Sequence, residues 1–298
     1  MKVFESYSQG IKRATIEIKM VFLLWLINIL FAVGIYPQFS NYLNKTISRS
    51  IAAENFIKYF DLHTFFELLI HQGDKFSAII SFTGLLIIGY ILASVFLNGG
   101  ILFTLIHPKK ANQKRRLAPV FFQGGGKFFG RFLRLVIYSL VLWIGIGIVM
   151  LIIHLILSPI TKGSTNESLM LGLFLVRGAI ALFLVFLVKM ILDYTRIKIV
   201  IQDTRKVFLS MWQAVGFVFR KLGSTLALYY LYVLTAFAIF ILYWWAQKAV
   251  KTHSLLPILI AFVIGQIFIL SRGWLRIGLQ AAQMKFFQAA KTKTSPIE

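Results

Sequence analysis

An arginine inside an apolar run is the residue in this sequence with the clearest chemical potential. Arg177 lies eight residues into the run 169–190, which places it about 12 Å deep if the run is a transmembrane helix. Inserting an arginine there costs about 2.5 to 3.5 kcal/mol, so it is a functional candidate by default. Its candidate partners are backbone carbonyls, Asn28, Gln266 or an anionic ligand such as a lipid phosphate. The favoured interpretation is that it reaches outward to the interface or stabilises helix packing through Asn28 or Gln266.

Two other motifs suggest chemistry and are rejected. His63, Glu67 and His71 recur every four residues, so a neighbouring pair on a helix could share a metal ion. A solvated face of an interfacial helix is the favoured interpretation, and no metal or cofactor is predicted. The segment 124–127 resembles a phosphate-binding loop, but Phe128 stands where such a loop needs Ser or Thr. Its glycines predict a bend at the membrane surface, and Gly126 with Gly130 predict close helix contact.

The side chains needed for catalysis are scarce. The chain has no cysteine, which excludes disulfides, thiol nucleophiles and cysteine-based metal sites. The acids expected on the inner side of a membrane are few: Glu5, Glu17, Asp193, Asp203 and Glu298. Neighbouring basic residues account for Asp193 and Asp203 as local ion pairs. We therefore predict no catalytic residues, and a protein that is not an enzyme.

Composition points to a membrane. The 298 residues are 58% hydrophobic and 14% charged, which is too apolar for a soluble domain of this size. The net charge of +22 comes from basic residues clustered between apolar runs. That pattern is typical of loops facing anionic lipid, so membrane lipids are the expected partners and nucleic acid is not.

Six apolar runs predict an all-helical, polytopic membrane protein with six transmembrane helices. They cover residues 20–36, 78–97, 135–157, 169–190, 222–246 and 255–270. Most Lys and Arg residues fall in the N-terminus, the second and fourth loops and the tail, so both termini are predicted to be cytoplasmic, in a bacterial inner membrane. No small-residue cleavage site follows the first run, which predicts an uncleaved signal anchor. An apolar stripe in the outer loop 37–77 predicts a helix on the outer surface.

Basic residues in the second and fourth loops are candidates for contact with lipid headgroups. The candidates are Lys109, Lys110, Arg115, Arg116, Arg196, Arg205 and Lys206. An acidic protein partner is a further possibility for these loops. The simpler interpretation is that they only set the topology, as in every polytopic protein.

A weak threefold repeat organises the chain. An amphipathic stretch precedes each odd-numbered run, at 3–19, 119–134 and 207–221, and similar basic segments follow the even-numbered runs. In 207–221 the apolar residues share one helical face, which predicts an interfacial helix in the membrane plane. The pattern predicts a single membrane domain of three units, 1–106, 107–200 and 201–290, with a tail at 291–298.

Three stretches carry a family resemblance, namely 23–37, 121–135 and 192–221. They resemble a group of uncharacterised bacterial multi-pass inner-membrane proteins. They are also distantly similar to the membrane domain attached to some glycerophosphodiester phosphodiesterases. No catalytic phosphodiesterase domain accompanies them in this sequence, so the resemblance does not imply that activity.

The leading hypothesis is a non-enzymatic integral membrane subunit that supports or assembles a larger membrane complex, with other membrane protein subunits as partners. The missing catalytic residues and abundant apolar surface motivate it. The alternative is a transporter or lipid-handling protein that uses Arg177 and the basic face to bind an anionic group.

Overall fold

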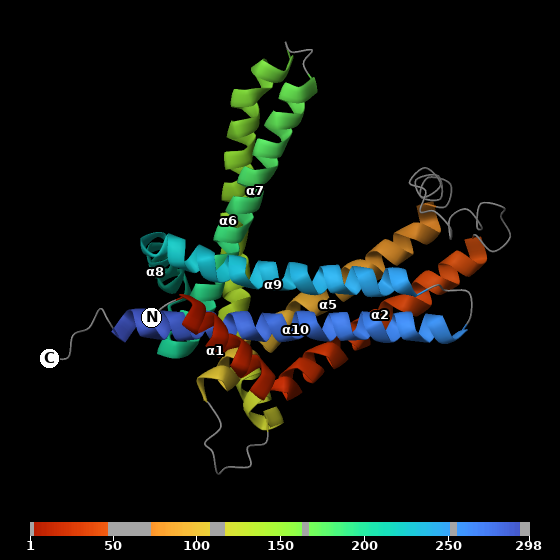
Figure 1. Ribbon diagram of the computed structural model, residues 1–298, viewed down its shortest axis with the longest axis horizontal. Coiled ribbons are helices and arrows are strands. Elements are labelled where there is room, and N and C mark those ends of the chain that lie inside the picture. The colour runs from red at the N-terminus through yellow and green to blue at the C-terminus, as the bar shows by residue number, and fades with distance from the viewer. Residues whose placement is uncertain (1–2, 47–72, 108–116, 163–166, 251–254, 293–298) are drawn as a thin grey trace. The chain divides into compact units, whose positions relative to one another are not determined.

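The computed structural model describes residues 3–46, 73–107, 117–162, 167–250 and 255–292. Within these ranges the chain is helical apart from short breaks, and no strand occurs. The helices are α1 (Val3–Ile16), α2 (Ile18–Thr46), α5 (Gly73–Ile106), α6 (Leu117–Lys162), α7 (Glu167–Gln202), α8 (Val207–Arg220), α9 (Leu222–Ala249) and α10 (Leu255–Thr292) (Figure 1). A helix satisfies its own backbone hydrogen bonds, which is what a chain needs in lipid.

Five of the described helices, α5, α6, α7, α9 and α10, are long and apolar enough to cross a membrane. A sixth span is obtained when α1 and the first part of α2 are counted together as one bent pair. The prediction of an all-α multi-pass membrane protein is therefore confirmed.

The chain forms two compact units. The smaller unit, Phe22–Val95, contains most of α2 and α5. There the Phe31 and Tyr90 rings meet edge to face with centroids 5.3 Å apart, and Tyr90 Oη donates a hydrogen bond to Asn28 Oδ1 at 3.3 Å. The larger unit comprises Met1–Val21 and Phe96–Glu298. The division into three repeated units remains a prediction.

Several predicted boundaries were too short. Residues 98–106 and 191–202, expected to lie beyond the spans, continue α5 and α7 as helix, and α10 extends to Thr292, well past the apolar run 255–270. The outer loop predicted to begin at Pro37 starts as helix too, because α2 contains Pro37 and continues to Thr46. The helix expected around 62–70 lies outside the described residues.

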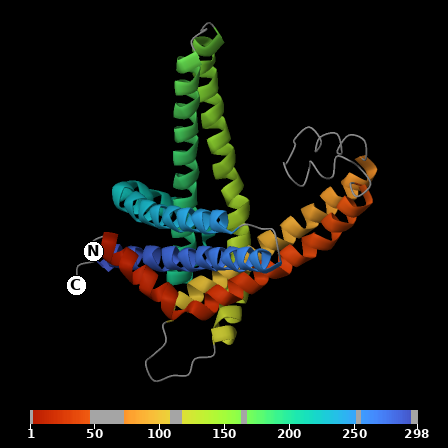
Figure 2. The same ribbon diagram turned by 45° about the vertical axis from the view of Figure 1, so that its right-hand side comes forward.

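The core of the larger unit lies at one end of its long helices. Figures 1 and 2 show the short helices α1 and α8 at this end. We call this region the basal layer: α1, α8 and residues 96–106, 117–135, 188–202, 225–232 and 275–287. By contrast, none of the most apolar stretch of α6 or of α10 is buried. The apolar stretches of α6 and α10 therefore present their side chains outward, as expected for surfaces that face lipid.

Each amphipathic segment packs on the end of another long helix. α1 packs on α10, α8 packs on α7, and the start of α6 contacts the end of α5. The rings of Tyr194 in α7 and Phe217 in α8 lie 5.1 Å apart. The α1–α10 pair joins the beginning of the chain to its end, and these contacts together hold the basal layer.

The glycines of α6 act differently from the prediction. α6 runs unbroken through 124–126, so no bend occurs there. Gly126 and Gly130 have no atom within 4 Å of a Cβ position, so they do not mediate close contact. That role belongs to Gly124 and Gly125, where a Cβ would lie 2.3 Å from Phe103 and 2.5 Å from Phe96.

Candidate functional site

Arg177 lies in α7 opposite His154 of α6. Its Nη1 donates to His154 Nδ1 at 3.5 Å, so the ring accepts with Nδ1 and carries its proton on Nε2. Within the described residues Arg177 Nε and Nη2 are buried and make no hydrogen bond. The sequence pattern did not single out His154 as a partner, although the α6–α7 hairpin brings together residues at similar distances along the chain from the connection at 163–166.

The two amides proposed as partners of Arg177 lie elsewhere. Asn28 belongs to the smaller unit and accepts the hydrogen bond from Tyr90. Gln266 lies on α10, half-buried. A ligand-binding role for Arg177, Asn28 and Gln266 remains a prediction.

The predicted headgroup residues divide into three groups. Lys109, Lys110, Arg115 and Arg116 lie outside the described residues. Arg196 Nη1 donates to Asp193 Oδ1 at 3.0 Å. Arg205 and Lys206 are exposed just before α8. Of the described residues in this set, the latter two present their charges to solvent or headgroups, whereas Arg196 is paired with a carboxylate.

Asp193 is buried in the basal layer. Besides the pair with Arg196, it accepts a hydrogen bond from Tyr229 Oη of α9 at 3.3 Å. The predicted local ion pair exists, and the contact with α9 adds a link between elements. A buried carboxylate is stable only with such partners, so Asp193 stabilises the packing of α9 on α7.

Asp203 links α6 to the turn between α7 and α8. Lys127 Nζ lies 2.8 Å from Asp203 Oδ2, and Arg131 Nη1 lies 2.6 Å from Oδ1. The sequence predicted that Asp203 pairs with basic residues next to it in the chain, whereas both of these partners belong to α6. Their hydrogen bonds to the carboxylate lower the pKa of Asp203 below its ordinary value.

A buried polar contact joins α5 to α10. Asn98 Oδ1 accepts hydrogen bonds from Arg276 Nη2 and Gln280 Nε2, each at 3.0 Å. Asn98, Asp193 and Gln280 are all buried, and each directly follows a leucine near the end of its long helix. A leucine followed by a polar residue is therefore a local sequence feature that these three buried residues share. This feature was not among those used to predict functional residues.

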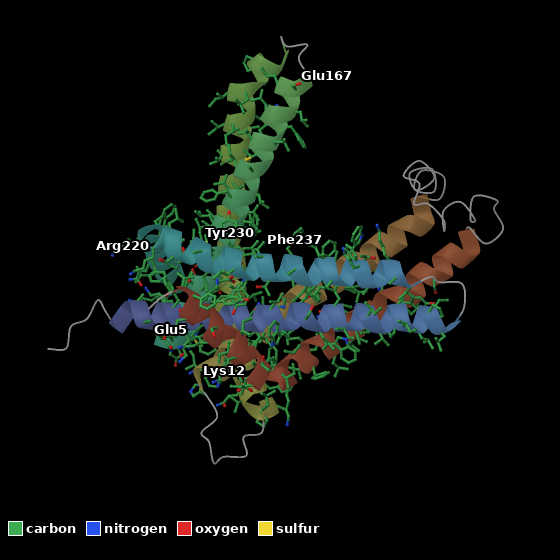
Figure 3. All side chains as sticks on the ribbon, in the orientation of Figure 1. Glu5, Lys12, Glu167, Arg220, Tyr230 and Phe237 are labelled. Atoms are coloured by element: carbon green, nitrogen blue, oxygen red, sulfur yellow. The ribbon has the colours of Figure 1, made fainter. Side chains whose placement is uncertain are left out.

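A cavity of about 250 Å³ opens between α1, α5 and α10. Its polar lining comes from Gln9, Lys12, Arg13, Lys285 and Gln288. Lys12 is labelled on α1 in Figure 3. The sequence gave no signal for this site, because it needs residues from both ends of the chain.

The described residues contain no group of three or more His, Asp or Glu side chains that could hold a metal ion. His63, Glu67 and His71 lie outside them. No family model, curated protein or solved structure matches the chain. The resemblance to bacterial inner-membrane proteins and to the phosphodiesterase membrane domain therefore remains a prediction.

Proposed function

We propose that this integral membrane protein is a non-enzymatic subunit that supports the assembly of a larger membrane complex. The glycines of the α6–α7 hairpin carry the proposal. Gly145, Gly147, Gly172 and Gly178 have no atom within 4 Å of a Cβ position. Small residues in transmembrane helices allow close approach of a neighbouring helix. Within the described part of the chain, no other helix makes such an approach at these four positions.

The basal layer provides the contrast. A Cβ at Gly10 would lie 2.6 Å from Gly278 O, and one at Gly100 would lie 2.8 Å from Phe121 O. At these two positions the basal layer uses glycine for a close contact within the chain. The open glycines of the hairpin are surrounded by exposed apolar side chains such as Leu151 and Phe174, a surface suited to a partner helix.

The test adds bulk to this surface. Gly145→Leu with Gly172→Leu is expected to release the partner subunit, because leucine prevents close helix approach. Ala238→Leu on the exposed face of α9 adds similar bulk away from the hairpin and should retain the partner. Mass and composition are measured by light scattering and mass spectrometry after extraction in mild detergent.

Recovery of the wild-type protein as a lone monodisperse chain would contradict the assembly role. Equal loss of the partner from the hairpin variant and the Ala238 variant would show that bulk at any lipid-facing position disrupts the complex, and the hairpin surface would then be wrong.

Arg177 supports a second candidate, a transporter or lipid-handling protein. Its buried Nε and Nη2 have no hydrogen bond within the described residues and can donate to an anionic group. In a liposome assay of lipid or anion transfer, we expect Arg177→Gln to reduce the rate. Lys189→Gln, an exposed position on the same helix, should leave it unchanged. If the Arg177 variant transfers lipid or anion at the wild-type rate, Arg177 does not have this role.

We place the protein in a bacterial cytoplasmic membrane with the basal layer on the cytoplasmic side. The charge distribution supports this orientation, since Arg13, Arg131, Arg205 and Arg220 all lie in or next to that layer.

A further inference from the structure

The cavity between α1, α5 and α10 is formed by segments from the two ends of the larger unit. α1 contributes Lys12 and Arg13, and α10 contributes Lys285. Lys12 and Lys285 are exposed, so their ammonium groups can reach a ligand in the cavity mouth. Three cations around one opening attract an anion more strongly than any of them alone.

The lining contains no acidic residue. Glu5 Oε1 accepts a hydrogen bond from Nε2 of the lining residue Gln9 at 3.3 Å. Glu17, directly after α1, is buried, with Oε1 3.4 Å from Arg13 Nη2. Within the described residues neither of these two atoms makes a hydrogen bond. Glu17 therefore positions the guanidinium by charge while leaving its donors available for a second acceptor.

The rest of the lining is apolar. Ile16, Leu105, Ile106 and Met284 line the cavity beside the cations. A site that pairs cations with an apolar wall matches a ligand with an anionic group on a hydrocarbon stem.

We propose that this cavity binds a phosphate ester, with Lys12, Arg13 and Lys285 contacting the phosphate and the apolar wall contacting the attached carbon chain. Arginine suits phosphate because its donors form a planar fork, and lysine supplies a point charge. The ester is either the headgroup of an anionic lipid or a soluble organic phosphate. The proposal is independent of the assembly role of the α6–α7 hairpin.

The test measures binding to the full-length protein in an uncharged detergent. The probes are dihexanoyl phosphatidic acid, dihexanoyl phosphatidylcholine and glycerol 3-phosphate. Lys12→Gln with Lys285→Gln is expected to weaken binding of the phosphatidic acid by about tenfold or more, because each charged contact contributes substantially to affinity.

Arg220→Gln with Lys221→Gln is the matched control. It also removes two positive charges, but from exposed positions outside the cavity, and should change the dissociation constant by less than about twofold. Equal weakening by both double variants would overturn the proposal, because diffuse electrostatic attraction would then explain the binding. Helix content by circular dichroism verifies that both variants are folded.

The probes separate the two sources of phosphate. Binding of dihexanoyl phosphatidic acid without competition from glycerol 3-phosphate identifies a lipid site, and competition identifies a site for soluble organic phosphates. Failure of both phosphate monoesters, dihexanoyl phosphatidic acid and glycerol 3-phosphate, to bind the wild type overturns the proposal. Equally tight binding of the zwitterionic diester phosphatidylcholine overturns it too, because the three cations would then not select an anionic phosphate.

Discussion

Gly10 sets how closely α1 approaches α10. A Cβ there would lie 2.5 Å from Tyr232 Oη, 2.6 Å from Ala282 Cβ and 2.6 Å from Gly278 O. Neither a methyl group nor a backbone oxygen can move aside as a flexible side chain can. The position therefore requires glycine for packing, although glycine is a poor helix former.

Gly10→Ala is expected to destabilise the protein by about 1 to 3 kcal/mol, the usual effect of overpacking a core. Gly216→Ala in α8 is the matched control, since no atom lies within 4 Å of its Cβ position and alanine favours helix by about 1 kcal/mol. Thermal unfolding in detergent should show a lower Tm for the first variant and an equal or higher Tm for the second. A shift in the same direction for both would refute the close contact.

The contribution of the Asp203 charge to the stability of the fold depends on pH. Its positive φ of 50° is one that asparagine also adopts, so Asp203→Asn removes the charge and retains the turn. Because the folded-state pKa is lowered from 3.8, the ion pairs stabilise the fold above that pH and lose this effect as pH falls through the folded-state value.

The wild type should exceed Asp203→Asn in stability by about 1 kcal/mol or less at pH 7, since the carboxylate is more than half exposed. The difference should disappear below the folded-state pKa of Asp203. Urea unfolding of both proteins at pH 7 and in acid measures this difference in stability. If the difference persists unchanged in acid, the ion pairs of Asp203 are not its source.

Residue chemistry was predictable only in part. Arg177 could be identified as a candidate from the sequence, because a charged residue inside an apolar run has few structural explanations. Its contact with His154 depends on the register of the α6–α7 hairpin, and the cationic cavity depends on α1 meeting α10. Neither relation is local, so neither appears as spacing in the sequence.

At the scale of single elements, α8 has two apolar faces with different roles. Met211 is buried on the face that packs on α7, whereas Phe208, Trp212 and Phe219 are exposed. The sequence grouped Met211 with the exposed aromatics on one membrane-facing side. The structure divides that group, because the helix packs on the protein with one face and offers its aromatics to the bilayer interface with the other.

Met211→Ala is therefore expected to destabilise the protein by about 2 to 5 kcal/mol in detergent, as removal of a buried side chain does. Trp212→Ala should leave the Tm nearly unchanged. The comparison of the two Tm values checks the orientation of α8, and a larger effect of the tryptophan would reverse the assignment of its faces.

The ends of the long helices were harder to predict than their apolar centres. The extensions of α5, α7 and α10 contain polar residues such as Asn98, Arg196 and Gln280, so hydropathy falls where the helix continues. Asn98 and Gln280 join α5 to α10, whereas Arg196 pairs with Asp193 of its own helix, and Asp193 in turn accepts a hydrogen bond from α9. Hydropathy therefore identified the spans, and tertiary contacts determined how far the helices extend.

At the scale of the whole molecule, the membrane orientation is directly testable. The chain has no cysteine, so single cysteines can be introduced without background. We expect Glu167→Cys, at the start of α7, to react with a membrane-impermeant maleimide added to intact cells. Lys206→Cys should react only after the membrane is permeabilised. The opposite labelling pattern would invert the topology.

The contact between α1 and α10 also constrains the order of assembly. α1 is synthesised well before α10, because residues 17–254 lie between the two helices. At about 5 to 20 residues per second, α1 waits roughly 15 to 55 seconds for its partner during translation. In that interval α1 lacks its contacts with α10, and the cationic cavity does not exist. A nascent chain thus has its earlier spans before it has the phosphate-ester site, which arises only after α10 has been synthesised.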